Sequence, residues 1–217
     1  MKALIFDLDG TLLNTIADLH TSTNYALKKF EYPERTLEEV TNFVGNGLRM
    51  LIKRALPFQA DEALISEVLA EMKGHYAEHC HDATAPYAGI PELLKYCTAT
   101  GIPMAVVSNK ADPMVKILCD HFFADHISIA MGDQLSYPRK PAPDMVFAAM
   151  QSLGVTEAYY VGDSDVDVQT AHNAGLPCLA CAWGFRSKES LIDAGAERIF
   201  DSPTSLLQAI SSGSLTF

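Results

Sequence analysis

Short apolar runs that end in polar or acidic residues recur along this chain and restrict the folds open to it. The runs cover residues 3–8, 103–107, 127–131, 158–161 and 177–182. Continuous apolar runs of this length are typical of strands buried on both faces of a parallel sheet. A helical stretch between two of them is bracketed by Pro143 and Gly154, as helices commonly are. The pattern predicts an α/β fold with a doubly wound, mostly parallel sheet.

The segment between the first two runs has a different pattern. Between residues 15 and 82, apolar residues recur every three or four positions in four stretches. Thr36 and Glu39 have the spacing of a capping box, and Asp61 is placed to cap a later helix. We therefore expect a helical-bundle cap domain over residues 15–82, inserted into an α/β catalytic core domain of residues 1–14 and 83–217.

Charge and composition limit the partners that the chain can have. Its 217 residues include 27 acidic and 16 basic side chains, for a formal net charge of -11. No run of lysine and arginine offers the phosphate contacts that nucleic-acid binding needs. We expect no membrane span and no signal peptide, because no apolar stretch has the required length or flanks. With an odd number of cysteines, five, this predicts a cytoplasmic protein with free thiols.

Two pairs of metal-ligating side chains are expected to have structural rather than metal-binding roles. Cys178 and Cys181 have the spacing of a redox or zinc pair, but in a strand they would point to opposite faces. His75 and His79 could share one helix face, but the sequence between them lacks the glutamate of an H-E-x-x-H motif. We expect the cysteines in the core and the histidines at a solvated helix end.

Acidic residues follow the first and the fourth apolar runs. Asp7 and Asp9 close the first run, and Asp163 closes the fourth. Because the carboxyl ends of parallel strands meet at one edge of a sheet, these side chains should converge. Two carboxylates ~4 Å apart repel by roughly 4 kcal/mol at an effective dielectric near 20, so the cluster requires a cation. Oxygen ligands at an open site favour Mg²⁺; a plain turn is the alternative for the first acidic segment.

Side chains suited to an anion follow the second and third runs. Ser108, Asn109 and Lys110 bring a hydroxyl, an amide and an ammonium group together after the second run. Lys140 follows the third run in a segment that two prolines stiffen, as a positioned charge would require. The alternatives are a helix cap for Ser108 and Asn109 and an ordinary helix-start loop for Lys140.

A further acid, Asp167, lies one helical turn beyond Asp163 on the same side. An acidic residue at a helix N-terminus, favoured there by the helix dipole, is the alternative for it. A purely structural explanation would require all four alternatives to hold by coincidence, in order, at four strand ends. The sequence therefore predicts a site that grips a phosphate group and holds a metal.

Taken together, these motifs resemble those of the haloacid dehalogenase superfamily of phosphatases. The matching residues, in order, are Asp7-Leu8-Asp9-Gly10-Thr11, Ser108, Lys140, and Gly162-Asp163-Ser164 with Asp167. Within the superfamily, the phosphoglycolate phosphatase group is the most similar, on the residues Val44-Gly45-Asn46-Gly47-Leu48, Ser108-Asn109-Lys110 and Trp183-Gly184-Phe185-Arg186. The resemblance covers nearly the whole chain, because many members insert a helical cap after the first motif. Asn14 departs from the pattern, since relatives often carry Asp there.

The resemblance implies hydrolysis of a phosphate monoester through an aspartyl-phosphate intermediate. Asp7 would be the nucleophile, and Asp9 would protonate the leaving alcohol and then activate water. Ser108 and Lys140 would complete the catalytic set by holding the phosphoryl oxygens. The expected phosphate-binding residues are Asp7, Leu8, Asp9, Ser108, Asn109 and Lys140.

The resemblance also implies a magnesium site. The expected ligands are Asp7, Asp9 through its backbone carbonyl, and Asp163. Asp167 and Ser164 are expected to support them from behind, by orienting Lys140 or metal-bound water.

The substrate implied is a small phosphorylated metabolite similar to phosphoglycolate. Asn46 and Gly47 in the cap are expected to reach its leaving group, and a plain turn between helices is the alternative for them. A sugar phosphomutase, a pyrophosphatase and a non-catalytic phosphate-binding regulatory protein remain alternatives for the whole chain. Both a monomer and a homodimer are compatible with the sequence.

Overall fold

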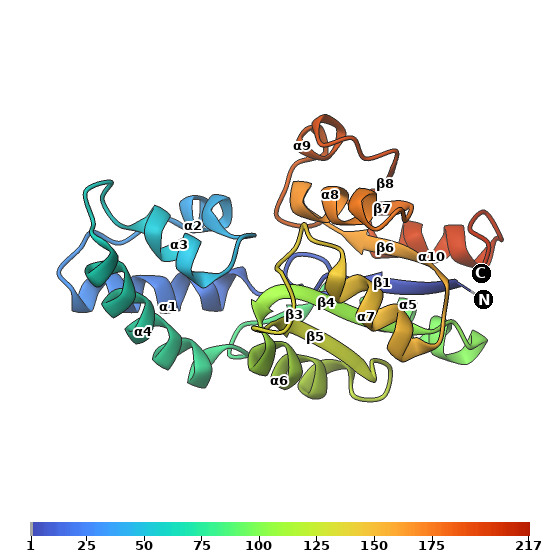
Figure 1. Cartoon of the computed structure of the whole chain (residues 1–217), viewed down its shortest axis with the longest axis horizontal. Coiled ribbons are helices and arrows are strands. Elements are labelled where there is room, and N and C mark those ends of the chain that lie inside the picture. Colours follow the sequence, from blue (N-terminus) through green and yellow to red (C-terminus); the bar gives the residue numbers. More distant parts are fainter. Residues whose placement is uncertain (1) are drawn as a thin grey trace. The chain divides into compact units, whose positions relative to one another are not determined.

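A six-stranded parallel sheet forms the larger of two compact units in this protein, whose computed structural model describes residues 2–217 (Figure 1). Its strand order is β5-β4-β1-β6-β7-β8. The strands are β1 (Lys2–Phe6), β4 (Met104–Ala111), β5 (Ile129–Asp133), β6 (Glu157–Gly162), β7 (Cys178–Cys181) and β8 (Arg198–Phe200). Each neighbouring pair is parallel, so the predicted α/β fold is confirmed.

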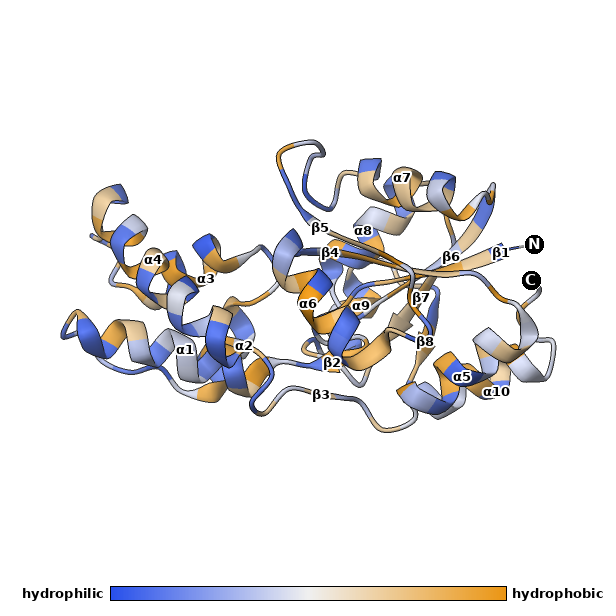
Figure 2. Ribbon diagram, turned by 90° about the horizontal axis from the view of Figure 1, so that it is seen from below, coloured by the Kyte–Doolittle hydropathy of each residue, from blue (hydrophilic) through white to orange (hydrophobic). Residues whose placement is uncertain are grey.

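Helices cover both faces of the sheet. They are α5 (Ile90–Thr100), α6 (Asp112–Phe123), α7 (Asp144–Leu153), α8 (Asp165–Asn173), α9 (Lys188–Asp193) and α10 (Pro203–Ser211). Side chains of α7 and α8 pack on the sheet face to which Ile5 and Tyr160 belong. Helix α5 packs against α10, and Figure 2 shows this pair on the opposite side of the sheet from α7. None of the described helices has the length and apolar character needed to cross a membrane.

The order of the strands creates a reversal beside β1. From β1 the chain moves to β4 and then to β5 on one side, and afterwards it returns to β6 on the other side of β1. The loops after β1 and β6 therefore diverge at the carboxyl edge of the sheet. Open α/β sheets bind ligands in the crevice outside such a reversal, so the loops that begin at Asp7 and Asp163 occupy the position where a site is expected.

The second compact unit, Thr15–Ala85, is helical. It contains α1 (Ile16–Lys29), α2 (Leu37–Phe43), α3 (Leu48–Ala55) and α4 (Glu62–His79). The helix starts follow the predicted capping: Thr36 and Glu39 form a capping box, and the Asp61 side chain accepts a hydrogen bond from Leu64 N at 2.8 Å. The first unit consists of the segment ending at Asn14 together with Pro86–Phe217. A small sheet of β2 (Leu13–Asn14) and β3 (Ala85–Pro86) lies where the chain passes between the units.

Two local details differ from the sequence expectations. Strand β8 was not predicted, because three residues that begin with an exposed arginine carry no apolar run. Strand β4 continues through Ser108, Asn109 and Lys110, although we expected the strand to end before them, and its pairing with β5 shifts register between Val107 and Ala111. Cys178 and Cys181 lie in β7 as free thiols, the first partly buried and the second buried.

Candidate active site

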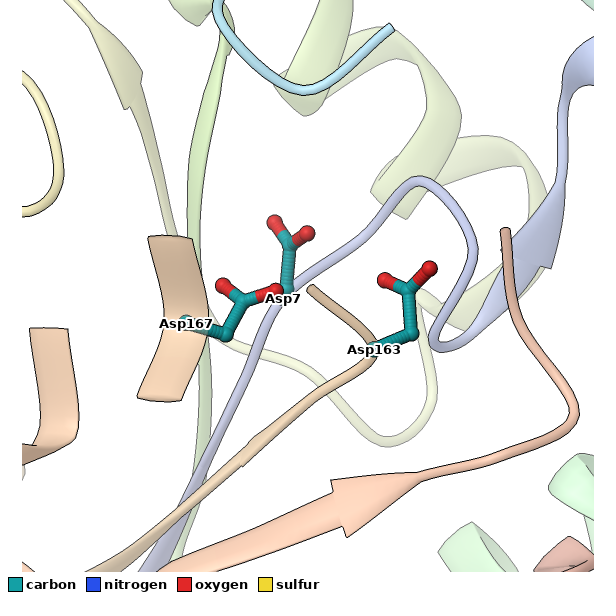
Figure 3. Close-up of side chains that lie close together, drawn as sticks. All are labelled: Asp7, Asp163 and Asp167. Carbon is teal, nitrogen blue, oxygen red and sulfur yellow. The ribbon is translucent and has the colours of Figure 1, made fainter. Parts of the chain in front are cut away.

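Three carboxylates converge at the sheet reversal, as Figure 3 shows. Asp7 follows β1, and Asp163 follows the neighbouring strand β6, whose Val161 carbonyl accepts a hydrogen bond from Asp7 N at 2.8 Å. Asp167 comes from the first turn of α8. One carboxylate oxygen from each of the three lies within 4.8 Å of the others, and all three residues are buried. Asp7 and Asp163 were predicted to converge because they follow parallel strands, and the Asp167 carboxylate lies directly with them.

A buried ammonium group, that of Lys140, sits between two of these carboxylates. Its Nζ lies 2.8 Å from Asp7 Oδ1 and 2.8 Å from Asp167 Oδ1. Lys140 Nζ also donates to the hydroxyl of Tyr160 at 3.0 Å. The contact with Asp7 is an ion pair without hydrogen-bond alignment, so Asp7 Oδ1 is left able to accept a further polar partner. Tyr160 belongs to the site although in the sequence it has the pattern of an ordinary buried strand residue.

Burial and mutual repulsion perturb the acid–base properties of this cluster. Burial raises the pKa of Asp7 from 3.8 to about 6, against the opposing pull of the Lys140 ammonium. Burial, with the negative charges of Asp167 and Asp7, raises the pKa of Asp163 well above its usual range. Burial alone would lower the pKa of Lys140, but Asp167 and Asp7 outweigh it and raise that pKa well above 10.5. The lysine therefore stays protonated, and its single positive charge does not balance the negative charges of the three carboxylates.

Asp167 contacts both the start of its own helix and Lys140. Its Oδ2 accepts hydrogen bonds from Ser164 Oγ at 2.6 Å and from Ser164 N at 3.1 Å, completing a capping box at the start of α8. Its Oδ1 faces Lys140. Gly162 packs against it so closely that an added Cβ would lie 2.3 Å from the Asp167 Cβ. The helix start thus fixes the carboxylate that orients the lysine.

Asp163 is held by donors from two other loops. Thr11 Oγ1 donates to its Oδ1 at 3.1 Å, and Phe185 N donates to its Oδ2 at 2.7 Å. Gly10 and Gly184 leave room for this carboxylate, since a Cβ at either position would lie under 2.5 Å from Asp163 Oδ2. The contacts of these four residues with Asp163 were not predicted, although Gly10-Thr11 and Gly184-Phe185 both stand in motifs that carried the resemblance.

Asn109 links the end of β4 to the loop that carries Lys140. Its side-chain amide donates to Lys140 O at 3.0 Å, and its side-chain oxygen accepts from Lys140 N at 2.8 Å. The N-cap of α6 is Ala111, with no side-chain cap, so Ser108 and Asn109 are not serving as that helix's cap. Ser108, the residue before Asn109, is buried and its hydroxyl accepts a hydrogen bond from Lys110 N at 3.3 Å. Asn109 therefore positions the Lys140 loop, and direct phosphate binding by Asn109 stays a prediction.

Asp9 faces a second buried lysine, Lys110, whose ammonium group we expected from the sequence to suit an anion together with Ser108 and Asn109. Lys110 Nζ lies 2.9 Å from Asp9 Oδ1 and 3.2 Å from Asp9 Oδ2. The Lys110 side chain is only 2% exposed and that of Asp9 is 14% exposed. The carboxylate of Asp9 is thus turned to Lys110 and is not part of the cluster of Asp7, Asp163 and Asp167, so the expected convergence of its side chain with those of Asp7 and Asp163 is corrected.

In the helical unit, the turn before α3 is shaped by glycine and held by one arginine. Gly45 and Gly47 have positive φ angles of 119° and 79°, a backbone region that other residues rarely adopt. Arg54 donates to Asn46 Oδ1 at 2.9 Å and to Phe43 O at 2.7 Å. Because a guanidinium carries donors only, it selects the oxygen of the Asn46 amide. The Asn46 amino group is the part of that side chain which can donate to another molecule.

The charge balance of the strand-end cluster suits a divalent cation. Asp7, Asp163 and Asp167 contribute three carboxylates and Lys140 one ammonium group. When all are ionised, two negative charges are uncompensated. Oxygen-only ligands of this kind are preferred by hard cations such as Mg²⁺. The residues present therefore fit a magnesium ion.

Comparison with known proteins decides the family. The model of the haloacid dehalogenase-like hydrolases matches residues 4–181, most of the chain. The chain belongs to this family. The resemblance inferred from the motifs is thus confirmed, as is the expectation of a hydrolytic enzyme.

Several relatives of this haloacid dehalogenase-like hydrolase share one name, phosphoglycolate phosphatase. The phosphoglycolate phosphatase of Pseudomonas syringae pv. tomato is 33% identical over 208 residues, which cover 92% of this chain and 76% of that protein. That of Mannheimia succiniciproducens is 32% identical and covers 96% of this chain and 98% of its own. A crystal structure from Lactobacillus delbrueckii subsp. bulgaricus, a protein assigned as a phosphoglycolate phosphatase by inference, has a TM-score of 0.92 at 36% identity, covering 96% of this chain and 98% of that one.

Proposed function

We propose that this hydrolase is a magnesium-dependent phosphatase of small phosphate monoesters, with 2-phosphoglycolate as its first candidate substrate. The observation that carries the proposal is the buried Asp7 carboxylate, placed at the sheet reversal beside Lys140 and within reach of Asp163. The names of the relatives support the substrate class. We also propose that the enzyme acts in the cytoplasm and binds no nucleic acid, as expected from the sequence.

The proposed metal ligands are Asp7, Asp163 and the backbone carbonyl of Asp9. Asp167 contacts Lys140 and Ser164, and we propose that it supports the metal ligands without binding the metal itself. When bound, Mg²⁺ would offset the negative charge that accumulates when an anionic ester meets an anionic nucleophile.

The proposed chemistry proceeds in two displacements. Asp7 attacks phosphorus, the bond from phosphorus to the leaving oxygen breaks, and Asp9, which has taken up a proton beforehand, gives that proton to the leaving oxygen. Asp9 then takes a proton from water, which attacks the aspartyl-phosphate, releases inorganic phosphate and restores the Asp7 carboxylate. Ser108 and Lys140 hold the phosphoryl oxygens throughout, and the fixed Lys140 charge favours the more anionic transition state.

The helical unit is proposed to be the cap that reads the leaving group. Its Asn46 and Gly47 are the residues proposed to reach the substrate, with the Asn46 amino group as the donor. Closure of such a unit would exclude water while the ester is cleaved.

The test is phosphate release from a panel of small esters, including 2-phosphoglycolate, with magnesium and with EDTA. We expect release that requires magnesium and is dominated by one or a few carboxylate-bearing esters. No release from any ester in the presence of magnesium would contradict the proposal and leave only the family and the fold.

A further inference from the structure

A contribution to the folding stability of the protein does not explain the Asp9–Lys110 ion pair. A buried ion pair often contributes no more to folding than apolar side chains of the same volume, because desolvation of the two charges offsets their attraction. Lys110 is nevertheless almost wholly buried, with its ammonium group against both oxygens of Asp9. A functional reason for a second buried cation is therefore needed.

The proposed role of Asp9 supplies that reason. A carboxylate whose two oxygens face an ammonium group accepts hydrogen bonds and donates none. Asp9 must therefore turn away from Lys110 before it can give a proton to the leaving oxygen. That movement would strip a buried ammonium group of this counter-charge, which is costly unless another anion takes the same place.

The position of Lys110 limits which anion can replace Asp9. Ser108, proposed to hold a phosphoryl oxygen, and Lys110 are two residues apart in β4, and Ser108 Oγ accepts a hydrogen bond from Lys110 N. Lys140 is occupied by the carboxylates of the core and is assigned to the phosphoryl group. An anion that meets Lys110 would thus belong to the leaving group of an ester already held by Ser108.

We propose that Lys110 is the residue that selects substrates with a carboxylate on the leaving group. The substrate carboxylate replaces that of Asp9 on Lys110, and Asp9 is released to act on the leaving oxygen. Binding of the correct substrate and release of Asp9 are then one exchange of ion pairs. The freed Asp9 carboxylate takes up a proton from solvent, and this is the proton that it gives to the leaving oxygen. This inference rests on the proposed function and assigns its specificity to one side chain.

The experiment compares two esters that differ in this one group. The esters are 2-phosphoglycolate and 2-hydroxyethyl phosphate, in which a neutral hydroxymethyl group stands in place of the carboxylate. The wild-type enzyme should prefer 2-phosphoglycolate by about 30-fold or more in kcat/KM, the range found when one partner of a buried charge pair is lost. Lys110→Met should lower kcat/KM for 2-phosphoglycolate by a similar factor. For the neutral ester it should cause no loss, because Asp9 is then already released.

The controls separate this role from a structural one. Lys110→Arg should restore part of the preference for the carboxylate. Lys116→Met removes an exposed lysine, ion-paired to Asp112 at 2.7 Å on α6, and should leave both kcat/KM values unchanged. Equal losses for the two esters in Lys110→Met would overturn the proposal by showing a general structural defect.

The wild-type protein alone also tests the inference, so a variant that fails to fold does not remove the test. Similar kcat/KM values for the two esters would contradict the role of Lys110 while leaving the phosphatase proposal intact. No phosphate release from either ester, or from the wider panel, would instead contradict the proposed function itself.

Discussion

The strand-end site of the core unit and the Gly45–Gly47 turn of the helical unit are built very differently. In the core unit, Asp163 and Asp167 are each fixed by hydrogen bonds or ion pairs from more than one loop, and both are buried. In the turn, Asn46 is partly exposed and its side-chain oxygen is held by the exposed Arg54. The difference teaches that the acids proposed to support the reaction, Asp163 and Asp167, are held from several sides, whereas the side chain proposed to read the substrate is held by one exposed residue.

The largest effect should come from Asp7, the proposed nucleophile of the core site. Asp7→Asn keeps the shape of the side chain but removes the nucleophile. Steady-state turnover should fall by about 10⁴-fold or more, as it does when the nucleophile of a hydrolase is removed. Phosphate release from 2-phosphoglycolate measures it. Turnover that survives the substitution would sink the nucleophile assignment and, with it, the distinction between the two regions.

The next effect is on the stability of the core site. Lys140→Met removes the cation between Asp7 and Asp167 and leaves both buried carboxylates without it. The free energy of unfolding, measured with urea in EDTA, should fall by about 3–5 kcal/mol. Lys188→Met breaks an exposed pair with Asp201 and should cost about 1 kcal/mol or less. Equal losses in the two variants would show that burial does not distinguish the pairs.

Magnesium should stabilise the protein more at neutral than at acidic pH. Burial raises the pKa of Asp7 from 3.8 to about 6 in the metal-free fold. A folded pKa above the unfolded one means that this group favours folding below about pH 4 and that the benefit, about 3 kcal/mol, is lost as the pH rises through 6. A cation beside Asp7 offsets that loss. Unfolding with and without magnesium, at about pH 5 and about pH 7.5, measures the difference; equal increments at both values would contradict it.

The smallest effect should come from the exposed turn. Arg54→Ala releases the Asn46 amide and should change kcat/KM for 2-phosphoglycolate by about tenfold or less, the equivalent of one ordinary hydrogen bond. Asn46→Ala should act in the same direction and alter the ranking of esters in the panel. Lys53→Ala, in the same helix, is the matched control and should change little. If neither Arg54→Ala nor Asn46→Ala alters the ranking, the segment is a plain turn.

Strand-end positions explain why much of this site could be predicted from the sequence. Asp7, Asp9 and Asp163 follow recognisable apolar runs, and parallel strands bring their ends together whatever the side-chain details. The partner of Asp9 could not be predicted, because Lys110 lies in a stretch of β4 where the register shifts and its side-chain direction is set by packing. Tyr160 escaped notice for a related reason, since its hydroxyl is used at the site while its ring has the pattern of an ordinary core residue.

The place of β1 in the sheet sets an order of events as the chain leaves the ribosome. The strand that ends at Asp7 is synthesised before the other strands of its sheet, yet its neighbours are β4 and β6, so its pairing is complete only when about residue 161 has emerged. The helical unit of Thr15–Ala85 is continuous in sequence and can complete its contacts before then. A domain inserted between a strand and its partners is thus able to fold first. The nucleophile would be assembled among the last parts of the molecule, after most of the chain that surrounds it has been made.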